Sequence, residues 1–190
     1  MAQNSNAIYP NLALGTSRLP FMRWQSQNGG LMLCHSDIFQ DHDGTDLLLR
    51  LRGNLHAANF IPSPNDVGYQ GSFVLHRSQN PSRRAFFIPG IATLAAAQLD
   101  INLKGCNLIN AIESVDGKLQ ITLSVIKAAG EAPFRLKDKD GNDLPMRDDV
   151  SSLEGADVDV VLIFYHTRDL TQNPVLVQTI ARVLDVQLLD

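Results

Sequence analysis

Apolar and polar residues alternate most regularly in residues 107–127. The apolar side chains of the second half occupy every second position: Leu119, Ile121, Leu123 and Val125. Asp116-Gly117 stands just before this run, and Asp-Gly favours a two-residue type I′ turn because both turn positions need positive φ. The pattern predicts a β-hairpin with residues 108–115 as its first strand. One face is apolar and the other polar, so we expect an antiparallel sheet with one face in water.

Strand patterns recur in six further segments: residues 30–35, 46–55, 69–77, 85–89, 134–137 and 155–166. In residues 46–55, Leu47, Leu49 and Leu51 lie on one face, and Arg50 and Arg52 lie on the other. The second half of residues 155–166 is apolar on both faces, which predicts a central strand that is buried on both sides.

Two segments fit more than one structure. Residues 91–99 are rich in alanine, which favours a helix, although their boundary signals are weak. Residues 175–189 alternate as a strand does, yet Leu176, Ile180 and Leu188 also match a helical stripe. We favour the strand for this second segment.

Seven or eight short strands and one helix predict a mainly β fold, either a barrel or a sandwich. An OB-like antiparallel barrel (the oligonucleotide-binding type), with extra strands and with the helix between strands three and four, fits this order of elements. A jelly-roll sandwich fits nearly as well. We expect residues 1–29, which are rich in Asn, Gln, Ser, Gly and Pro, to form an extended N-terminal arm. Residues 30–190 are expected to form a single β-rich domain.

Charge is unevenly distributed along the chain, although the formal net charge is only −4. Residues 1–110 carry 8 basic and 6 acidic side chains, and residues 111–190 carry 8 and 14. This gradient suits a partner with an anionic surface, and it equally suits no such partner. The N-terminus lacks a secretory pattern, and no apolar run approaches the roughly 18 residues of a membrane helix. The chain has two cysteines, Cys34 and Cys106, which are too few for a disulfide framework. This indicates a reducing cytoplasm.

No pattern predicts catalysis or a metal site, so we expect a non-enzymatic protein that needs no cofactor. The five histidines lack the HxH and HExxH spacings of metal sites. Residues 138–149 resemble a calcium loop, but Gly141 comes too early and Asp149 stands where a Glu is needed. A plain β-turn is the better interpretation, and Asp41-His42-Asp43 is likewise interpreted as a solvated turn.

Basic and aromatic residues together form the best candidate site. Proteins that bind single-stranded nucleic acid use cations along the phosphates and rings on which bases stack. The candidate residues are Arg50, Arg52, Tyr69, Arg77, Arg83, Arg84 and Phe87. The alternative interpretation is that the arginines form an ordinary solvated face and that the aromatic side chains belong to the core.

The C-terminal half resembles a known family. The predicted hairpin is followed by KDKDGNDLP (137–145), then by GADVDVVLIFYH (155–166), and finally by ARVLDVQLL (181–189). This order resembles phage-type single-stranded DNA-binding proteins with an OB barrel, in which an Asp-x-x-Gly-x-x-Leu turn precedes a strand that begins with Gly. Residues 6–12, which include Tyr9-Pro10, are similar to the short extended opening of that family.

The resemblance implies single-stranded DNA binding in the replication or recombination of a phage or mobile element, in the host cytoplasm. It implies single-stranded DNA as the partner and no membrane association, and it leaves homo-oligomer formation open. A second class also fits the sequence, namely a β-rich virion or assembly component such as a decoration or tail protein. In that case the N-terminal arm would contact neighbouring subunits.

Overall fold

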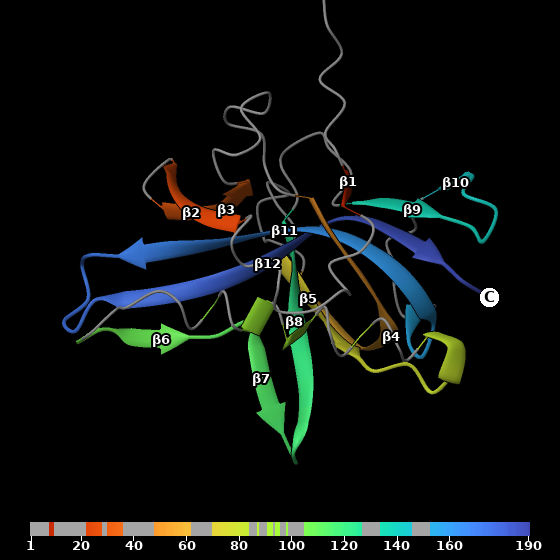
Figure 1. Ribbon diagram of the computed structural model, residues 1–190, viewed down its shortest axis with the longest axis horizontal. Coiled ribbons are helices and arrows are strands. Elements are labelled where there is room, and N and C mark those ends of the chain that lie inside the picture. Colours follow the sequence, from red (N-terminus) through yellow and green to blue (C-terminus); the bar gives the residue numbers. More distant parts are fainter. Residues whose placement is uncertain are drawn as a thin grey trace, which may run out of the picture.

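The described residues of the computed structural model contain twelve strands, which form one continuous sheet (Figure 1). The structure describes residues 8–9, 22–27, 30–35, 48–61, 70–83, 87, 91–92, 94–95, 98, 105–126, 134–145 and 153–190. The strands are, in chain order, β1 (Ile8–Tyr9), β2 (Met22–Gln27), β3 (Gly30–His35), β4 (Leu48–Ile61), β5 (Gln70–His76), β6 (Asn107–Ile109), β7 (Ile112–Val115), β8 (Lys118–Ile126), β9 (Arg135–Lys137), β10 (Asp143–Leu144), β11 (Asp157–Asp169) and β12 (Leu176–Leu188).

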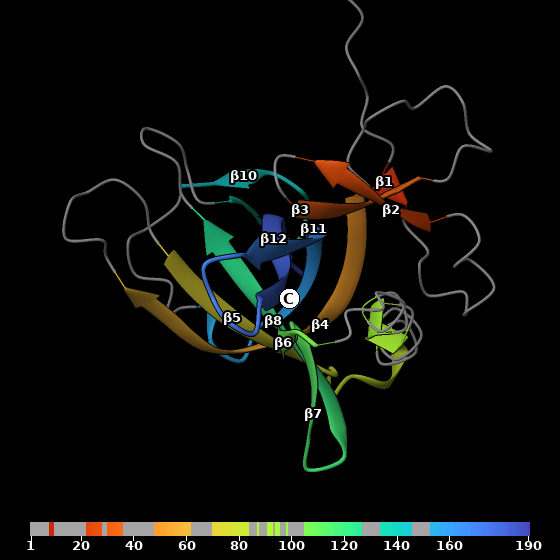
Figure 2. The same cartoon turned by 90° about the vertical axis from the view of Figure 1, so that its left-hand side faces the viewer.

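Five of these strands close into a barrel. β4, β5 and β8 form an antiparallel meander, β12 joins β8 in parallel, and β11 pairs antiparallel with both β12 and β4. Figure 2 shows these strands arranged around a common interior. The fold is therefore mainly β and is the OB-like barrel that the sequence predicts, rather than the two stacked sheets of a jelly roll.

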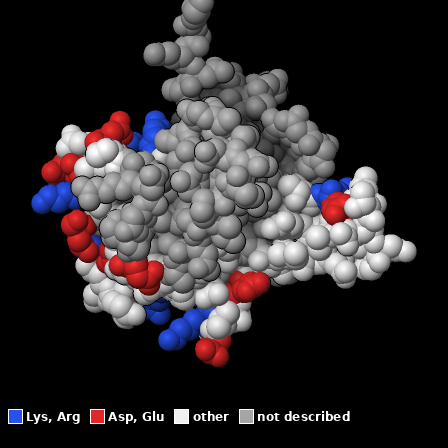
Figure 3. Space-filling view, turned by 180° about the vertical axis from the view of Figure 1, so that it is seen from behind, with Lys and Arg blue, Asp and Glu red and all other residues white. Residues whose placement is uncertain are grey.

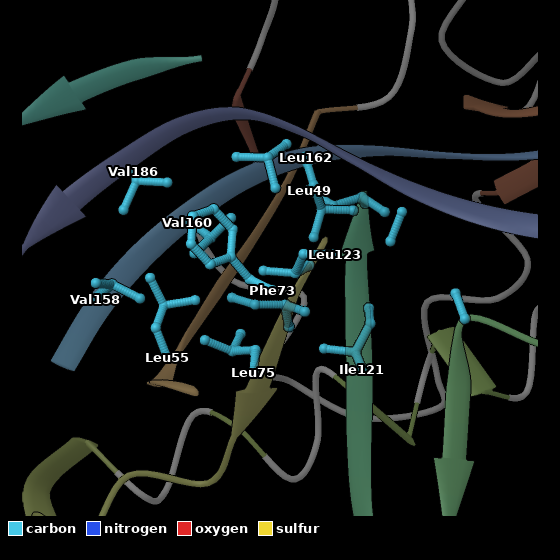
Figure 4. Packing of buried hydrophobic residues seen from close by; sticks show 14 of the residues in the cluster. Leu49, Leu55, Phe73, Leu75, Ile121, Leu123, Val158, Val160, Leu162 and Val186 are labelled. Carbon is cyan, nitrogen blue, oxygen red and sulfur yellow. The ribbon is translucent and has the colours of Figure 1, made fainter. Parts of the chain in front are cut away.

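Alternating apolar residues of the barrel strands fill the interior. Figure 4 shows the inward side chains of this core, among them Leu49, Leu55, Phe73, Leu75, Ile121, Leu123, Val158, Val160, Leu162 and Val186. β4 passes close to β5 at Gly53, where a Cβ would lie 2.5 Å from the carbonyl oxygen of His76. The Leu-rich face of β4 thus packs inward and leaves its arginines outside.

The predicted hairpin is confirmed at its turn and corrected at its first strand. Val115 pairs with Lys118 across Asp116-Gly117, whose φ values of 51° and 74° are those of a type I′ turn. Ile121, Leu123 and Val125 are buried and alternate with half-buried residues. The first strand, however, includes only β7, because β6 ends at Ile109 and pairs instead with β12. The predicted strand 108–115 therefore divides between two partners.

Other strand predictions are confirmed with shifted limits. Residues 175–189 form a strand, β12, and β11 is buried on both faces from Val158 to Phe164. β4 continues six residues beyond the predicted 46–55. The predicted strand 85–89 is wrong, because Phe87 is helical. The other α-helical residues that the structure describes are 81–83, Ile91, Ala92, Leu94, Ala95 and Gln98. They come between the second and third barrel strands, β5 and β8, rather than between the third and fourth.

The N-terminal part contributes strands to the sheet. β1 pairs with β4 in parallel, and β2 pairs with β3 in an antiparallel hairpin. β3 in turn pairs with β11 at Tyr165 and His166. The division into an arm and a domain stays a prediction, because most of residues 1–29 lies outside the described residues. Within the described residues, no helix is long and apolar enough to cross a membrane.

Candidate nucleic-acid interface

Charged residues line up across four neighbouring strands on the outside of the barrel. In one row Arg50 on β4 is opposite Val161 on β11, Asp185 on β12 and Arg135 on β9. The next row contains Arg52, Asp159, Gln187 and Lys137 in the same order. Directly paired residues share a face, so both rows belong to one surface, about 14 Å wide at roughly 4.8 Å per strand. We call this surface the strand face.

Two arginines share one buried carboxylate at the β4 side of the strand face. Arg52 donates its Nε–H to Oδ2 of Asp159 at 2.9 Å, and Nε of Arg50 lies 3.1 Å from Oδ1. Asp159 is only 3% exposed, whereas the side chains of Arg50 and Arg52 are 31% and 39% exposed. One carboxylate cannot neutralise two guanidiniums, so the cluster keeps one positive charge directed at solvent.

The same arrangement recurs at the β9 side. Arg135 donates from Nε and Nη2 to the two oxygens of Asp185, and the Nη2 bond is 2.7 Å. Nζ of Lys137 lies 3.9 Å from Oδ2 of the same carboxylate. Asp185 raises the pKa of Arg135 through this hydrogen bond and its charge. Two cations again share one buried carboxylate, although Asp143 on β10 lies opposite Lys137 and is exposed.

An apolar and aromatic patch begins at Val161, between the two clusters, and continues along β11 beyond the row of Arg50 and Asp185. Leu48, Val161 and Ile163 are buried together outside the main core, with Tyr165 and Leu184 packed against them. Burial raises the pKa of Tyr165, and the charge of Arg182 opposes this shift. Arg182 is paired with Ile163 in the sheet, and its buried Nε has no hydrogen-bond partner in the described structure. This patch and Arg182 lie on the same outer face of β11 and β12 as the two rows, and we include Tyr165 and Arg182 in the strand face.

The predicted site residues separate into several groups. Arg50 and Arg52 lie together on the strand face, as their alternation predicts. Phe87 is 0% exposed and belongs to the core, so the prediction that it stacks on bases is corrected. Tyr69 and Arg84 lie outside the described residues. Arg77 is exposed just after β5 and lies outside both rows of the strand face.

Arg83 holds the end of the chain rather than standing free in solvent. It donates from Nη1 to Asp157 at 2.9 Å and from Nη2 to Asp190 at 2.7 Å. Nη2 also donates to the carbonyl oxygen of Leu189. Both carboxylates accept hydrogen bonds from this guanidinium and raise its pKa, with the bond to Asp190 contributing most. These contacts give Arg83 a structural role. Its predicted role in nucleic-acid binding stays a prediction.

Four residues of the strand face were missed by sequence reasoning: Tyr165, Arg135, Lys137 and Arg182. The last three come from segments far from Arg50 in the sequence, and only strand pairing brings them together. Tyr165 belongs to a strand that is apolar on both faces, so the sequence pattern does not show which of its residues lie on the outer face. In ARVLDVQLL (181–189), simple alternation would place Arg182 and Asp185 on opposite faces. A β-bulge near Leu184 brings both to the outer face, and the sequence pattern does not reveal this bulge.

The described surface carries both charge signs in close proximity. Figure 3 shows Lys and Arg side chains beside Asp and Glu side chains at several places on one face of the molecule. The cationic character of the strand face is therefore local. It comes from the burial of Asp159 and Asp185 beneath more exposed cations, rather than from a large field of one sign.

The described residues contain no group of three or more His, Cys, Asp or Glu side chains placed to hold a metal ion. The calcium-like segment is a turn, as predicted. Asp138 accepts backbone N–H bonds from Asp140 and Asn142, and its carbonyl accepts from Gly141. These hydrogen bonds close the β9–β10 hairpin.

Comparison with known proteins finds similarity in structure alone. No protein-family model matches the sequence, and no curated protein matches it. The single-stranded DNA-binding protein of bacteriophage Enc34 in complex with ssDNA is 12% identical, with 86% of this chain and 92% of that chain covered and a TM-score of 0.49. A C-terminal truncation of the Enc34 protein is 11% identical over 88% of this chain and 94% of that chain, with a TM-score of 0.45. The bacteriophage T7 single-stranded DNA-binding protein gp2.5 is 10% identical over 75% of this chain and 86% of that chain, with a TM-score of 0.42. Over most of its length this chain is thus similar to single-stranded DNA-binding proteins of bacteriophages, a similarity between structures at low sequence identity.

Proposed function

We propose that this chain is a non-enzymatic protein that binds single-stranded DNA on the strand face. The observation that carries this proposal is the paired arrangement of cations over the buried carboxylates Asp159 and Asp185. Each carboxylate holds two cations beside each other while keeping little exposed surface of its own. Such cations are positioned before the ligand arrives, so less side-chain entropy is lost when phosphates bind.

The second component of single-strand recognition is also present on the strand face. Tyr165 offers a ring next to Arg182, and rings that stack on bases contribute about 1–3 kcal/mol per base. Guanidiniums bind phosphate oxygens without reading the sequence. OB barrels are known as scaffolds for oligonucleotide binding, which supports the proposal by analogy of fold. The finer proposal is a role in phage or mobile-element replication or recombination in the host cytoplasm, as for the family that the sequence resembles.

The test is a salt-dependent binding measurement on a labelled oligo-dT. We expect binding at low salt, a logarithmic affinity that falls linearly with the logarithm of salt concentration, and weaker binding to duplex of equal length. The double variant Arg50→Gln/Arg52→Gln keeps amide donors near Asp159 but removes two charges. The magnitude of its salt slope should fall by about 1.4, because each phosphate contact on a single strand contributes roughly 0.7.

A control removes an exposed charge elsewhere. Arg168 lies near the β11–β12 turn, seven residues along β11 from Val161 and away from both rows of the strand face. Arg168→Ala should leave the salt slope nearly unchanged. Absence of oligo-dT binding at low salt, or equal affinity for duplex and single strand, would overturn the proposed function and favour a virion or assembly role.

A further inference from the structure

A groove outside the strand face has the composition of a nucleotide site. It has a volume of about 440 Å³ and is lined by His56 of β4, by the end of β5 and the residues after it, by Gly117 of the β7–β8 turn and by the start of β8. This volume lies within the roughly 300–1,000 Å³ of small-molecule sites. The lining residues used below are His56, His76, Arg77 and Lys118. In Figures 1 and 2 the β7–β8 hairpin projects beyond the barrel, and this hairpin contributes Lys118 to the groove.

The two histidines present rings to the groove. Their ring centroids are 4.8 Å apart with an interplanar angle of 86°, an edge-to-face arrangement. Nδ1 of His56 lies 3.2 Å from Oε1 of Glu154, which holds the His56 ring in place. Burial lowers the pKa of His76, and the neighbouring His56 and Lys118 lower it further. At neutral pH His76 is therefore an uncharged ring, suited to stacking rather than to pairing with phosphate.

The cations of the groove stand at its edge. Arg77 and Lys118 are both exposed; Arg77 follows the end of β5, and Lys118 is the first residue of β8. A phosphate placed between them would be bound by a guanidinium and an ammonium, while a base could lie against the imidazole rings. Cations and rings together are what single-strand binding needs.

The groove is continuous with the strand face along β4. Arg50, Arg52, Asn54 and His56 alternate along the outer face of that strand, and Asn54 is opposite His76 on β5. Arg50 and His56 are six residues apart, or about 20 Å at 3.3 Å per residue. This length is compatible with the roughly 4–16 nucleotides that one OB barrel covers.

We propose that the groove binds one nucleotide of a DNA strand that also lies on the strand face, with Arg77 and Lys118 holding its phosphate and His56 and His76 contacting its base. This inference rests on the proposed function, because it extends the same binding path. It assigns the β7–β8 turn a role in setting how many nucleotides one molecule covers.

The test compares Arg77→Ala/Lys118→Ala with the control Arg168→Ala, which removes an exposed charge distant from both the groove and the strand face. For an oligo-dT of about 12 nucleotides, within the site size of an OB barrel, we expect the groove variant to bind about tenfold more weakly at low salt. The control should change affinity by less than about threefold, since distant exposed charges are screened. Circular dichroism of each variant verifies folding.

A second measurement uses the unmodified protein. The imidazole C–H signals of His56 and His76 are followed by NMR during titration with the same oligo-dT, after assignment with His→Gln variants. Both signals should shift as the oligonucleotide binds. If the unmodified protein binds oligo-dT while the groove variant and the control behave alike and the histidine signals do not move, the groove proposal is overturned alone. If no oligo-dT binds, the proposed function fails and the groove proposal fails with it.

Discussion

Nε of Arg52 donates to Oδ2 of Asp159 at 2.9 Å, and this carboxylate is 3% exposed while the arginine remains 39% exposed. Arg50 approaches the other oxygen of the same carboxylate. Asp159 therefore has two opposing effects on the strand face, because it positions two guanidiniums and also cancels one of their charges. Which effect is larger for DNA binding can be decided by one substitution.

Asp159→Asn keeps the size of the side chain and removes its charge. Phosphate binding depends mainly on the number of cations available, so we expect affinity for oligo-dT to rise a few-fold and the salt slope to steepen by up to about 0.7. The free energy of unfolding should fall by about 1–3 kcal/mol, because hydrogen bonds to a buried charged group are lost. Anisotropy titrations at several salt concentrations, together with urea denaturation, measure both quantities. Weaker binding with a shallower slope would show that positioning by Asp159 is the larger effect.

Tyr165 provides a test of base stacking that is separate from charge. Tyr165→Leu removes the ring but keeps an apolar side chain against Val161 and Ile163, whereas Tyr165→Phe keeps the ring. We expect the Leu variant to lose about 1–3 kcal/mol of binding free energy for oligo-dT, and the Phe variant to bind nearly as the unmodified protein does. The salt slope should stay the same in both variants. Equal affinities for the Leu and Phe variants would exclude stacking on Tyr165.

The interior of the barrel can be tested through neighbouring positions of one strand. Leu123 on β8 and Leu162 on β11 are both 0% exposed, whereas Thr122 is half-buried on the outer face. Leu123→Ala and Leu162→Ala should each reduce the free energy of unfolding by about 2–5 kcal/mol. Thr122→Ala should cost much less. Similar losses at Leu123 and Thr122 in urea denaturation would contradict the register in which Leu123 pairs with Phe73.

The parts of the fold that were predictable depend on local chemistry. Asp116-Gly117 determines its turn because only a few residue types adopt positive φ there, and the Leu–Arg alternation of β4 assigns Arg50 and Arg52 to the outer face. β12 was predicted as a strand on alternation alone. These features need no knowledge of distant partners.

The parts that were not predictable depend on pairing between distant segments. Arg135 and Asp185 are fifty positions apart and meet only because β9 pairs in parallel with the end of β12. Residues 108–115 look continuous, but they divide between β12 and β8. Phe87 shows a different difficulty, because a short apolar run fits a buried helical segment as well as a strand. The residues next to Phe87 in the sequence therefore do not reveal that its side chain is buried in the core.

His166 links the stability of the fold to pH. The imidazole is 2% exposed, and its Nδ1 lies 3.0 Å from Oγ1 of Thr179 on the neighbouring strand. Burial lowers the pKa of His166 from 6.5 to about 4, with a further contribution from the charge of Arg168. The folded state thus keeps this ring neutral at pH values where the unfolded chain already binds a proton. Stability is fully present above about pH 6.5 and is lost as the pH falls toward 4, with no further loss below that.

The pH prediction is measured as a difference between two proteins, so that other titrating groups cancel. Urea denaturation of the unmodified protein and of His166→Gln is compared at several pH values between about 7.5 and 4.5. The advantage of the unmodified protein should shrink as the pH falls through this window. The slope should approach 1.4 kcal/mol per pH unit, because each unit of pKa difference corresponds to about that free energy. A difference that does not change with pH would mean that His166 binds its proton equally well in the folded and unfolded states, and that water reaches the ring between β11 and β12.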